Sequence, residues 1–138
     1  MNALVIGCGR VGSSVAKHLD REGWDVSVVD EKEEALNRLG TGWKGGFVVG
    51  HGMDIDVLRE AGIEEADAVV VATNGDNTNL VIAQIAQRRF EVPRVVARVL
   101  DPRRAAWYQE QGLRTICPTQ IAIEQLERAA LTDPVETS

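Results

Sequence analysis

The stretch of sequence that decides the fold is Gly7-Cys8-Gly9-Arg10-Val11-Gly12. Its G-x-G-x-x-G spacing directly follows the apolar run 3–6 and opens segment 10–22, in which apolar residues recur at helical intervals. Strand, glycine-rich turn and helix in this order are typical of a dinucleotide-binding unit. We expect Gly7 to permit the tight turn, Gly9 to let a pyrophosphate approach the backbone, and Gly12 to let the helix pack on the sheet.

The rest of the chain alternates strands with helices. Short apolar runs that end at a glycine or a polar residue predict strands at 3–6, 26–29, 47–49, 68–72, 94–100 and 115–117. Helical spacing, capping residues and terminal glycines predict helices at 10–22, 35–39, 54–61, 76–90, 101–111 and 120–131. Strands joined by helices pair in parallel through right-handed crossovers.

The sequence therefore predicts an α/β fold with a Rossmann-like, doubly wound parallel sheet. Six strands fit the order 3-2-1-4-5-6, with helices on both faces. Residues 1–132 form one nucleotide-binding domain in this interpretation, and residues 133–138 form a polar tail.

Composition limits the partners and the compartment. The 138 residues carry a net charge of −6, which argues against nucleic acid as a partner, because neutralising phosphates needs a basic face. No apolar run approaches the roughly 20 residues of a membrane span, so we expect no direct membrane insertion. Cys8 and Cys117 form no C-x-x-C motif and cannot build a tetrahedral metal site unaided, so two buried, reduced thiols in the cytoplasm are expected.

Asp30 lies 18 residues after Gly12, at the end of the second predicted strand. A carboxylate at this place binds ribose hydroxyls, and it repels a 2′-phosphate, which disfavours NADP. NAD, ATP, ADP and AMP all offer a free ribose diol, so Asp30 does not distinguish among them. The alternative that the glycines serve packing alone stays open.

Five segments are expected to meet at the carboxyl ends of the strands, where the strand order reverses. The candidate nucleotide-binding residues are Gly7, Cys8, Gly9, Arg10, Val11, Gly12, Asp30, Glu31, His51, Gly52, Met53, Ala72, Thr73, Asn74 and Arg98.

Three of these candidates carry alternatives. Arg10 is either a cation beside the phosphates or a solvated side chain. His51 has no partner carboxylate or nucleophile at a recognisable spacing, so we expect it to line the pocket or contact the adenine edge rather than to catalyse. Arg98 lies within an apolar strand, where an unpaired charge is costly, so it needs either a ligand phosphate or an acidic residue.

A set of further stretches, in order and spacing, is more specific than the glycine motif. The set comprises residues 7–16, Val28-Val29-Asp30, residues 56–63, residues 66–73, Asp76-Asn77 with Asn79-Leu80, and residues 93–98. Over residues 2–131 the chain resembles the N-terminal RCK (KTN, TrkA-N) nucleotide-binding domain of Trk/Ktr-type potassium-uptake regulators. Its Cys-Gly-Arg-Val-Gly-Ser-Ser form is most similar to actinobacterial TrkA-like proteins.

The resemblance implies a cytoplasmic, non-catalytic regulatory subunit that binds ATP, ADP or NAD(H). Such a subunit gates a membrane potassium transporter, lies at the inner face of the membrane through that partner, and forms homodimers that assemble into rings. Full-length members often carry a second C-terminal ligand domain, so the chain is either an excised domain or a short member.

Two departures from the family pattern concern the site. Many members have Gly-Asp-Ala-Thr where this chain has Gly50-His51-Gly52-Met53. Some members place a metal-binding Glu after the proline that follows the sixth strand, but Thr119 follows Pro118 here, so no metal site is predicted.

Two competing functions remain open at this point. A small NAD-dependent oxidoreductase, or its cofactor-binding domain, would use the same loop, but most dehydrogenases need a further substrate domain. The short-chain reductase motif Tyr-x-x-x-Lys is missing, because Gly112 stands four residues after Tyr108. A pure assembly module with a vestigial pocket is the other alternative.

The helices at 77–90 and 120–131 carry apolar residues on more than one face. This pattern predicts that one face packs on the sheet and another on a partner subunit, with a symmetric contact as the commonest arrangement. The alternative is that the two helices pack on each other.

Overall fold

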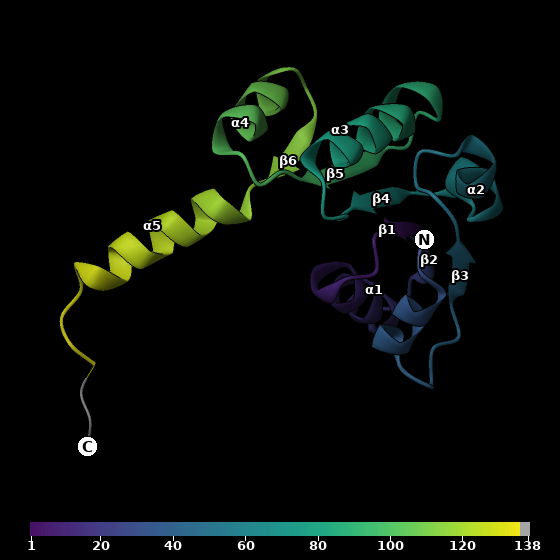
Figure 1. Ribbon diagram of the computed structural model, residues 1–138, viewed down its shortest axis with the longest axis horizontal. Coiled ribbons are helices and arrows are strands. Elements are labelled where there is room, and N and C mark those ends of the chain that lie inside the picture. Colours follow the sequence, from purple (N-terminus) through teal and green to yellow (C-terminus); the bar gives the residue numbers. More distant parts are fainter. Residues whose placement is uncertain (136–138) are drawn as a thin grey trace.

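A six-stranded parallel sheet with the order β3-β2-β1-β4-β5-β6 forms the centre of the protein in the computed structural model, which describes residues 1–135 (Figure 1). The strands are β1 (Asn2–Ile6), β2 (Asp25–Asp30), β3 (Gly46–Val49), β4 (Ala68–Val71), β5 (Arg94–Arg98) and β6 (Arg114–Ile116). The predicted fold class and strand order are confirmed.

The helices fall where the sequence placed them, with two differences of type. The α-helices are α1 (Arg10–Arg21), α2 (Ile55–Glu60), α3 (Asp76–Gln84), α4 (Pro102–Glu110) and α5 (Pro118–Ala130). The predicted helix at 35–39 is a 3₁₀ helix, η1 (Glu33–Leu39), and a second short 3₁₀ turn is η2 (Ile63–Glu65). The end of the predicted helix 76–90 is a π-helical segment, η3 (Ile85–Arg89).

Strand β1 lies at the point where the strand order reverses. It pairs with β2 on one side, with Leu4 opposite Ser27, and with β4 on the other side, with Leu4 opposite Val69. All pairs are parallel, so the carboxyl ends of the strands meet at one edge of the sheet. The loops at this edge are where ligands bind in open α/β sheets.

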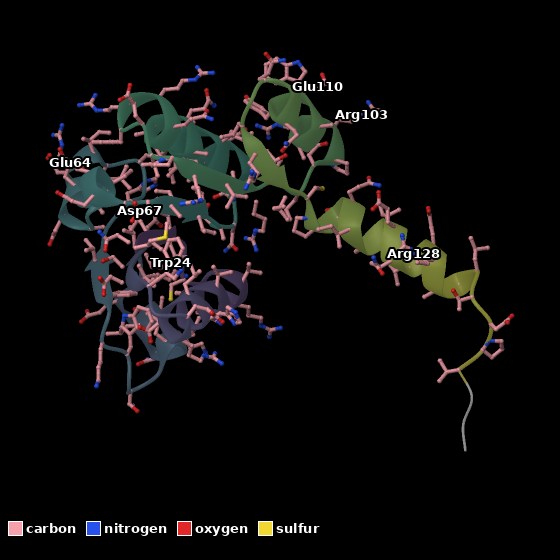
Figure 2. All side chains as sticks on the ribbon, turned by 180° about the vertical axis from the view of Figure 1, so that it is seen from behind. Trp24, Glu64, Asp67, Arg103, Glu110 and Arg128 are labelled. Atoms are coloured by element: carbon pink, nitrogen blue, oxygen red, sulfur yellow. The ribbon has the colours of Figure 1, made fainter. Side chains whose placement is uncertain are left out.

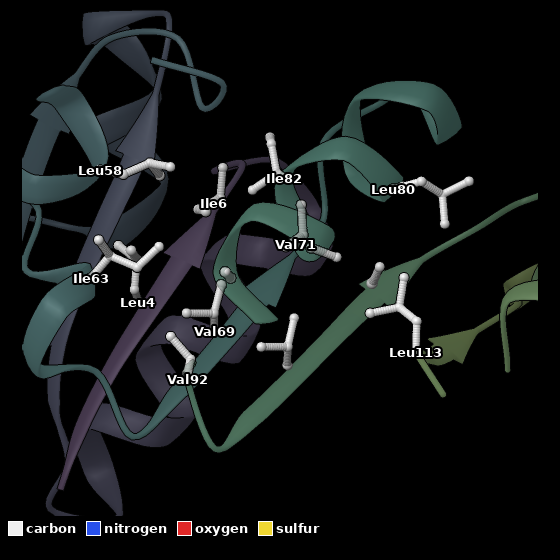
Figure 3. Close-up of a cluster of buried hydrophobic side chains, with 14 of the residues drawn as sticks. Leu4, Ile6, Leu58, Ile63, Val69, Val71, Leu80, Ile82, Val92 and Leu113 are labelled. Carbon is white, nitrogen blue, oxygen red and sulfur yellow. The ribbon is translucent and has the colours of Figure 1, made fainter. Parts of the chain in front are cut away.

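Alternating residues of the central strands fill two cores, one on each face of the sheet. Leu4 and Ile6 belong to the larger core, which α2, α3 and α4 cover and which Figure 3 shows. Ala3 and Val5 face the smaller core, where Ala16 of α1 and Leu39 of η1 pack on the sheet. Burial on both faces explains why β1 is a continuous apolar run rather than an alternating one.

Helix starts follow the capping chemistry of the sequence. Asp54 accepts a hydrogen bond from the N–H of Asp56 at 2.9 Å and begins α2. Asp101 accepts from the N–H of Arg103 at 2.9 Å and begins α4, with Pro102 in the first turn. Strand β5 ends at Arg98, two residues before the predicted end.

Helix α5 extends away from the sheet and from the other helices (Figure 1). None of its residues is buried, and Leu126 is 70% exposed. The expectation that one face of this helix packs on the sheet of its own chain is therefore wrong, and so is the alternative in which the helix packs on α3, because α5 projects from the body instead. Of the predicted polar tail, 133–138, residues 133–135 carry no regular structure, and 136–138 lie outside the described residues.

Across residues 1–135, no helix is both long enough and apolar enough to cross a lipid bilayer.

Candidate functional site

The glycine loop between β1 and α1 packs closely on the neighbouring strand end. Gly7 has φ +101°, a conformation that L side chains rarely adopt, and its N–H donates to the Val29 carbonyl at 2.8 Å. A Cβ at Gly7 would lie 2.6 Å from the Ala72 carbonyl oxygen, and one at Gly12 would collide with the Gly7 carbonyl. Backbone geometry and packing therefore require glycine at the first and third positions of the motif.

Gly9 differs from these two glycines. A Cβ at Gly9 would meet no atom within 4 Å, so packing does not explain this glycine. Gly9 is also the N-cap of α1, and no side chain of the described residues caps this helix. The N-terminus of α1 therefore has no side-chain cap among the described residues and has open space beside it at Gly9, and an uncapped helix N-terminus with its positive dipole end is an arrangement that binds anions.

Asp30 ends β2 and is held at the rim of the loop. Its Oδ2 accepts from the Cys8 N–H at 2.8 Å, and its Oδ1 accepts from the Lys32 N–H at 2.8 Å. A carboxylate oxygen accepts more than one hydrogen bond, so both oxygens can also receive hydroxyl donors. Its fixed orientation fits the binding of a ribose diol.

A cleft of about 360 Å³ opens above these groups at the carboxyl ends of the strands. This volume lies within the usual range of small-molecule sites. The predicted residues that line it are Gly7, Cys8, Gly9, Asp30, Glu31, His51, Gly52, Ala72, Thr73 and Asn74. Residues from four loops, which lie far apart in the sequence, thus meet in one place.

The other predicted site residues lie beside the cleft and do not line it. Arg10 and Val11 are exposed at the start of α1. Gly12 is buried and packs against the backbone of Gly7. Met53 is 41% exposed in the loop after β3. Their contact with a ligand remains a prediction.

Arg98 lies behind the Thr73 wall of the cleft. Its Nη2 donates to the Thr73 carbonyl at 2.6 Å and to the Ala72 carbonyl at 3.4 Å, whereas its buried Nε has no partner. Within residues 1–135, no carboxylate comes within salt-bridge distance of Arg98. Backbone carbonyls therefore hold this side chain, and its predicted contact with a phosphate remains a prediction.

His51 has a carboxylate partner that its sequence spacing did not reveal. Its Nε2 lies 2.9 Å from Glu31 Oε1, and its Nδ1 accepts from the Met53 N–H at 3.2 Å. The neutral ring therefore carries its proton on Nε2 and donates to Glu31. The pairing arises because β2 and β3 are neighbours in the sheet, which brings the loops that follow them together.

Sequence reasoning missed two cations that line the cleft, Lys32 and Arg38, and also missed Thr78 of α3. Lys32 stands two residues after Asp30, so its position was a usable signal. Arg38 is in η1, three residues after Ala35, whose carbonyl accepts from the Cys8 thiol at 3.3 Å. Residues three apart lie on the same side of a 3₁₀ helix, and both Ala35 and Arg38 line the cleft.

Cys8 forms part of the cleft floor as a buried thiol. Its burial raises the pKa above the ordinary value, and the neighbouring Asp30 charge raises it further, whereas Arg38 and Lys17 act in the opposite direction. The thiol is therefore protonated near neutral pH, and it serves as a small packing group.

Comparison with known proteins identifies relatives of the whole chain. The Trk system potassium uptake protein TrkA of Streptomyces coelicolor is 42% identical over 136 residues, which are 99% of this chain and 61% of that protein. The chain thus spans about three fifths of the length of this relative.

Solved structures share the fold. The C-terminal domain of Kef from Shewanella denitrificans, in its AMP-bound form, has a TM-score of 0.81 at 24% identity and covers 95% of this chain and 80% of its own. GsuK bound to ADP and the GsuK channel bound to NAD each have a TM-score of 0.76 at 24% identity. Each covers 91% of this chain, with 32% and 22% of their own chains matched.

The family model of the TrkA-N domain matches residues 3–119, which include the whole cleft and all of the sheet except Asn2, the first residue of β1. The chain therefore belongs to the TrkA-N domain family.

Proposed function

We propose that this chain is a nucleotide-sensing regulatory domain of a potassium uptake system, which binds ATP, ADP or NAD(H) in the cleft. The observation that carries the proposal is the loop at Gly9, where the N-terminus of α1 has no side-chain cap among the described residues and a Cβ would meet no atom within 4 Å, close to the fixed carboxylate of Asp30. A helix N-terminus that binds phosphates and a carboxylate that binds the ribose hydroxyls, at this separation along the chain, are the phosphate and ribose parts of an adenine nucleotide site.

The ligand would lie with its phosphates on the N-terminus of α1 and its ribose at Asp30. Its adenine would then reach the loops that follow β2 and β3, where Glu31, His51 and Gly52 line the cleft. Lys32 and Arg38 place two cations along the same rim. The AMP of the Kef domain and the ADP and NAD of GsuK support an adenine nucleotide as the ligand class.

A regulatory rather than a catalytic role fits the side chains of the cleft. His51 already engages Glu31 and the Met53 N–H, and the Cys8 thiol is buried and protonated. The Trk naming of the Streptomyces coelicolor relative supports potassium uptake as the process. A membrane potassium transporter subunit, contacted from the cytoplasmic side, is the partner that this proposal implies.

A homodimer, or a ring built from dimers, is the assembly that we propose. Val96 and Ile116 lie on the face of the sheet opposite the larger core, and neither belongs to the two cores. Ile116 is 48% exposed, and the neighbouring α5 has no buried residue. Helix α5 of a second copy would cover this face and bury its own apolar residues.

Calorimetric titration of the chain with ATP, ADP, AMP, NAD and NADH tests the proposal. Binding of at least one of them at micromolar to sub-millimolar concentration is expected, and NADP is expected to bind more weakly than NAD because of Asp30. Failure of all five to bind the folded chain would leave the assembly module as the better interpretation. Oxidation of NADH with a carbonyl substrate would instead favour the oxidoreductase.

A further inference from the structure

Asp76, the first residue of α3, links the wall of the cleft to the turn between β5 and α4. It directly follows Thr73, Asn74 and Gly75, which line the cleft, but it does not line the cleft itself. Its Oδ1 accepts from the Leu100 N–H at 2.8 Å, and its Oδ2 accepts from the Asp101 N–H at 3.1 Å. One carboxylate thus holds two consecutive amides of a different loop.

A buried side chain ties the same wall to the end of β5. Asn79 is 1% exposed, and its Oδ1 accepts from the Thr73 N–H at 3.0 Å. Its Nδ2 donates to the Thr73 carbonyl at 3.1 Å and to the Arg98 carbonyl at 2.9 Å. Both polar ends of this amide are therefore used, so Thr73 and the end of β5 form one rigid unit.

The turn that Asp76 holds also contacts the first residues of the projecting helix. The Leu100 carbonyl accepts from the Cys117 thiol at 3.5 Å, and the Val99 N–H donates to the Ile116 carbonyl at 3.0 Å. Cys117 is the N-cap of α5, and its sulfur accepts from the Gln120 N–H at 3.4 Å. The backbone therefore joins the cleft wall to Asp76, and a series of hydrogen bonds continues from Asp76 to the start of α5.

We infer that Asp76 is a positioning residue that transmits the state of the cleft to the direction of α5, an inference that rests on the proposed nucleotide binding. A ligand that displaces the wall at Thr73–Gly75 displaces the start of α3, and the Asp76 carboxylate carries the Leu100–Asp101 turn with it. Helix α5 responds because none of its residues packs against the rest of the chain deeply enough to be buried. Hydrogen-bonded elements with two discrete arrangements are the physical carrier of such coupling.

The test measures a distance between two spin labels in the full chain. Glu64→Cys and Arg128→Cys place them on the exposed surface of the sheet domain and on α5 (Figure 2). Cys8 and Cys117 are buried and escape labelling under native conditions. Mixing labelled chain with an excess of unlabelled chain keeps the measured pair within one subunit. Saturating ADP or NAD, whichever calorimetry shows to bind, is expected to shift the distance distribution.

In the same labelled chain, Asp76→Ala is expected to keep the nucleotide affinity within about threefold and to lose at least half of the shift. Asp76→Asn keeps one acceptor for the Leu100 N–H and is expected to give an intermediate shift. This variant still tests the inference if the alanine variant folds poorly. A purely structural role would lower the thermal midpoint and leave the shift of the folded, liganded chain intact.

Asp67→Ala is the matched control. Asp67 is also a half-buried carboxylate that accepts one backbone N–H, that of Asn2 at 2.8 Å, but it lies at the amino ends of the strands (Figure 2). The Asp67→Ala variant should keep the whole nucleotide-induced shift in the distance between the labels. The inference is overturned by a full shift in Asp76→Ala, by loss of the shift in Asp67→Ala, or by nucleotide binding to the unsubstituted chain without a shift. If the unsubstituted chain fails to bind nucleotide, calorimetry shows this without any distance measurement. That result would contradict the proposed function itself, and the inference about Asp76 would fall with it.

Discussion

At the level of single residues, each glycine of the loop is required for a different physical reason. Gly7 and Gly12 are required by backbone conformation and by the close approach of strand and helix, whereas Gly9 leaves space that the protein itself does not fill. Asp30 complements this space, because both of its oxygens are oriented by backbone N–H groups at the rim. Ligand binding and folding can therefore be separated by substitution.

Gly9→Ala is expected to weaken nucleotide binding at least tenfold while leaving the fold intact. The added methyl group occupies the space through which phosphates approach the N-terminus of α1. Its φ of −83° suits alanine, and the reduced freedom of the unfolded chain offsets the poorer N-cap to within about 1 kcal/mol. Calorimetry and thermal unfolding measure the two effects. A large loss of stability with unchanged affinity would contradict this role of Gly9.

Asp30→Ala is expected to weaken ATP, ADP and NAD alike, by about 1–3 kcal/mol for the loss of charge-assisted hydrogen bonds to the ribose. The comparison of all three ligands matters, because they share the ribose diol and differ in phosphate number. Unchanged affinity in a folded Asp30→Ala protein would rule out ribose binding at this carboxylate. Asp67→Ala, which removes a carboxylate at the opposite edge of the sheet, should leave all three affinities unchanged.

At the level of the elements, the sequence predicts strands better than the details of helices. The apolar run of β1, the glycine motif after it and the helical crossovers between strands together predict the sheet order. Capping residues locate the starts of α2 and α4. The 3₁₀ geometry of η1 could not be read from periodicity. Arg38 was missed as a lining residue because local spacing does not show that η1 borders the cleft. The pairing of His51 with Glu31 depends on neighbouring strands, and their side-chain rotamers are not encoded in local spacing.

The cap of α2 gives a prediction at this scale. Asp54→Ala removes the acceptor for the Asp56 N–H and is expected to lower the free energy of unfolding by about 1 kcal/mol. Denaturant unfolding followed by circular dichroism measures the change, and Asp54→Asn, which keeps an acceptor oxygen, should restore most of it. Equal losses in both variants would mean that the charge, rather than the hydrogen bond, stabilises this helix end.

On the scale of the whole molecule, α5 is the element that the sheet domain leaves without a covering partner. Its apolar residues include Leu126 at 70% exposure and Ile121 at 49%, and they lie on a helix that extends from the body (Figure 1). The sequence predicted an apolar excess in this helix. The prediction that one face of this helix packs on its own sheet was wrong, because helical periodicity shows an apolar face and not what covers it.

Leu126→Glu is expected to convert an oligomer into a monomer without loss of stability in the isolated subunit, since the side chain is exposed there. Light scattering at micromolar concentration, with and without nucleotide, should report at least a dimer for the unsubstituted chain. Glu127→Gln serves as a control on the same exposed helix. A monomer that persists for the unsubstituted chain at high concentration with nucleotide present would exclude self-association of this domain.

The central position of β1 has a consequence for how the chain folds. Strand β1 pairs with β2, the next strand along the chain, but its other edge stays unpaired until β4 has been synthesised, with Ala3 opposite Ala68. Loop-closure entropy makes such non-local parallel pairing slow. The half of the sheet that carries Asp30 and the glycine loop can therefore collapse first during synthesis, with one edge of β1 unprotected. Docking of the second half then completes the wall of the cleft, so the ability to bind nucleotide should appear late in folding, together with the Ala72–Asn74 loop.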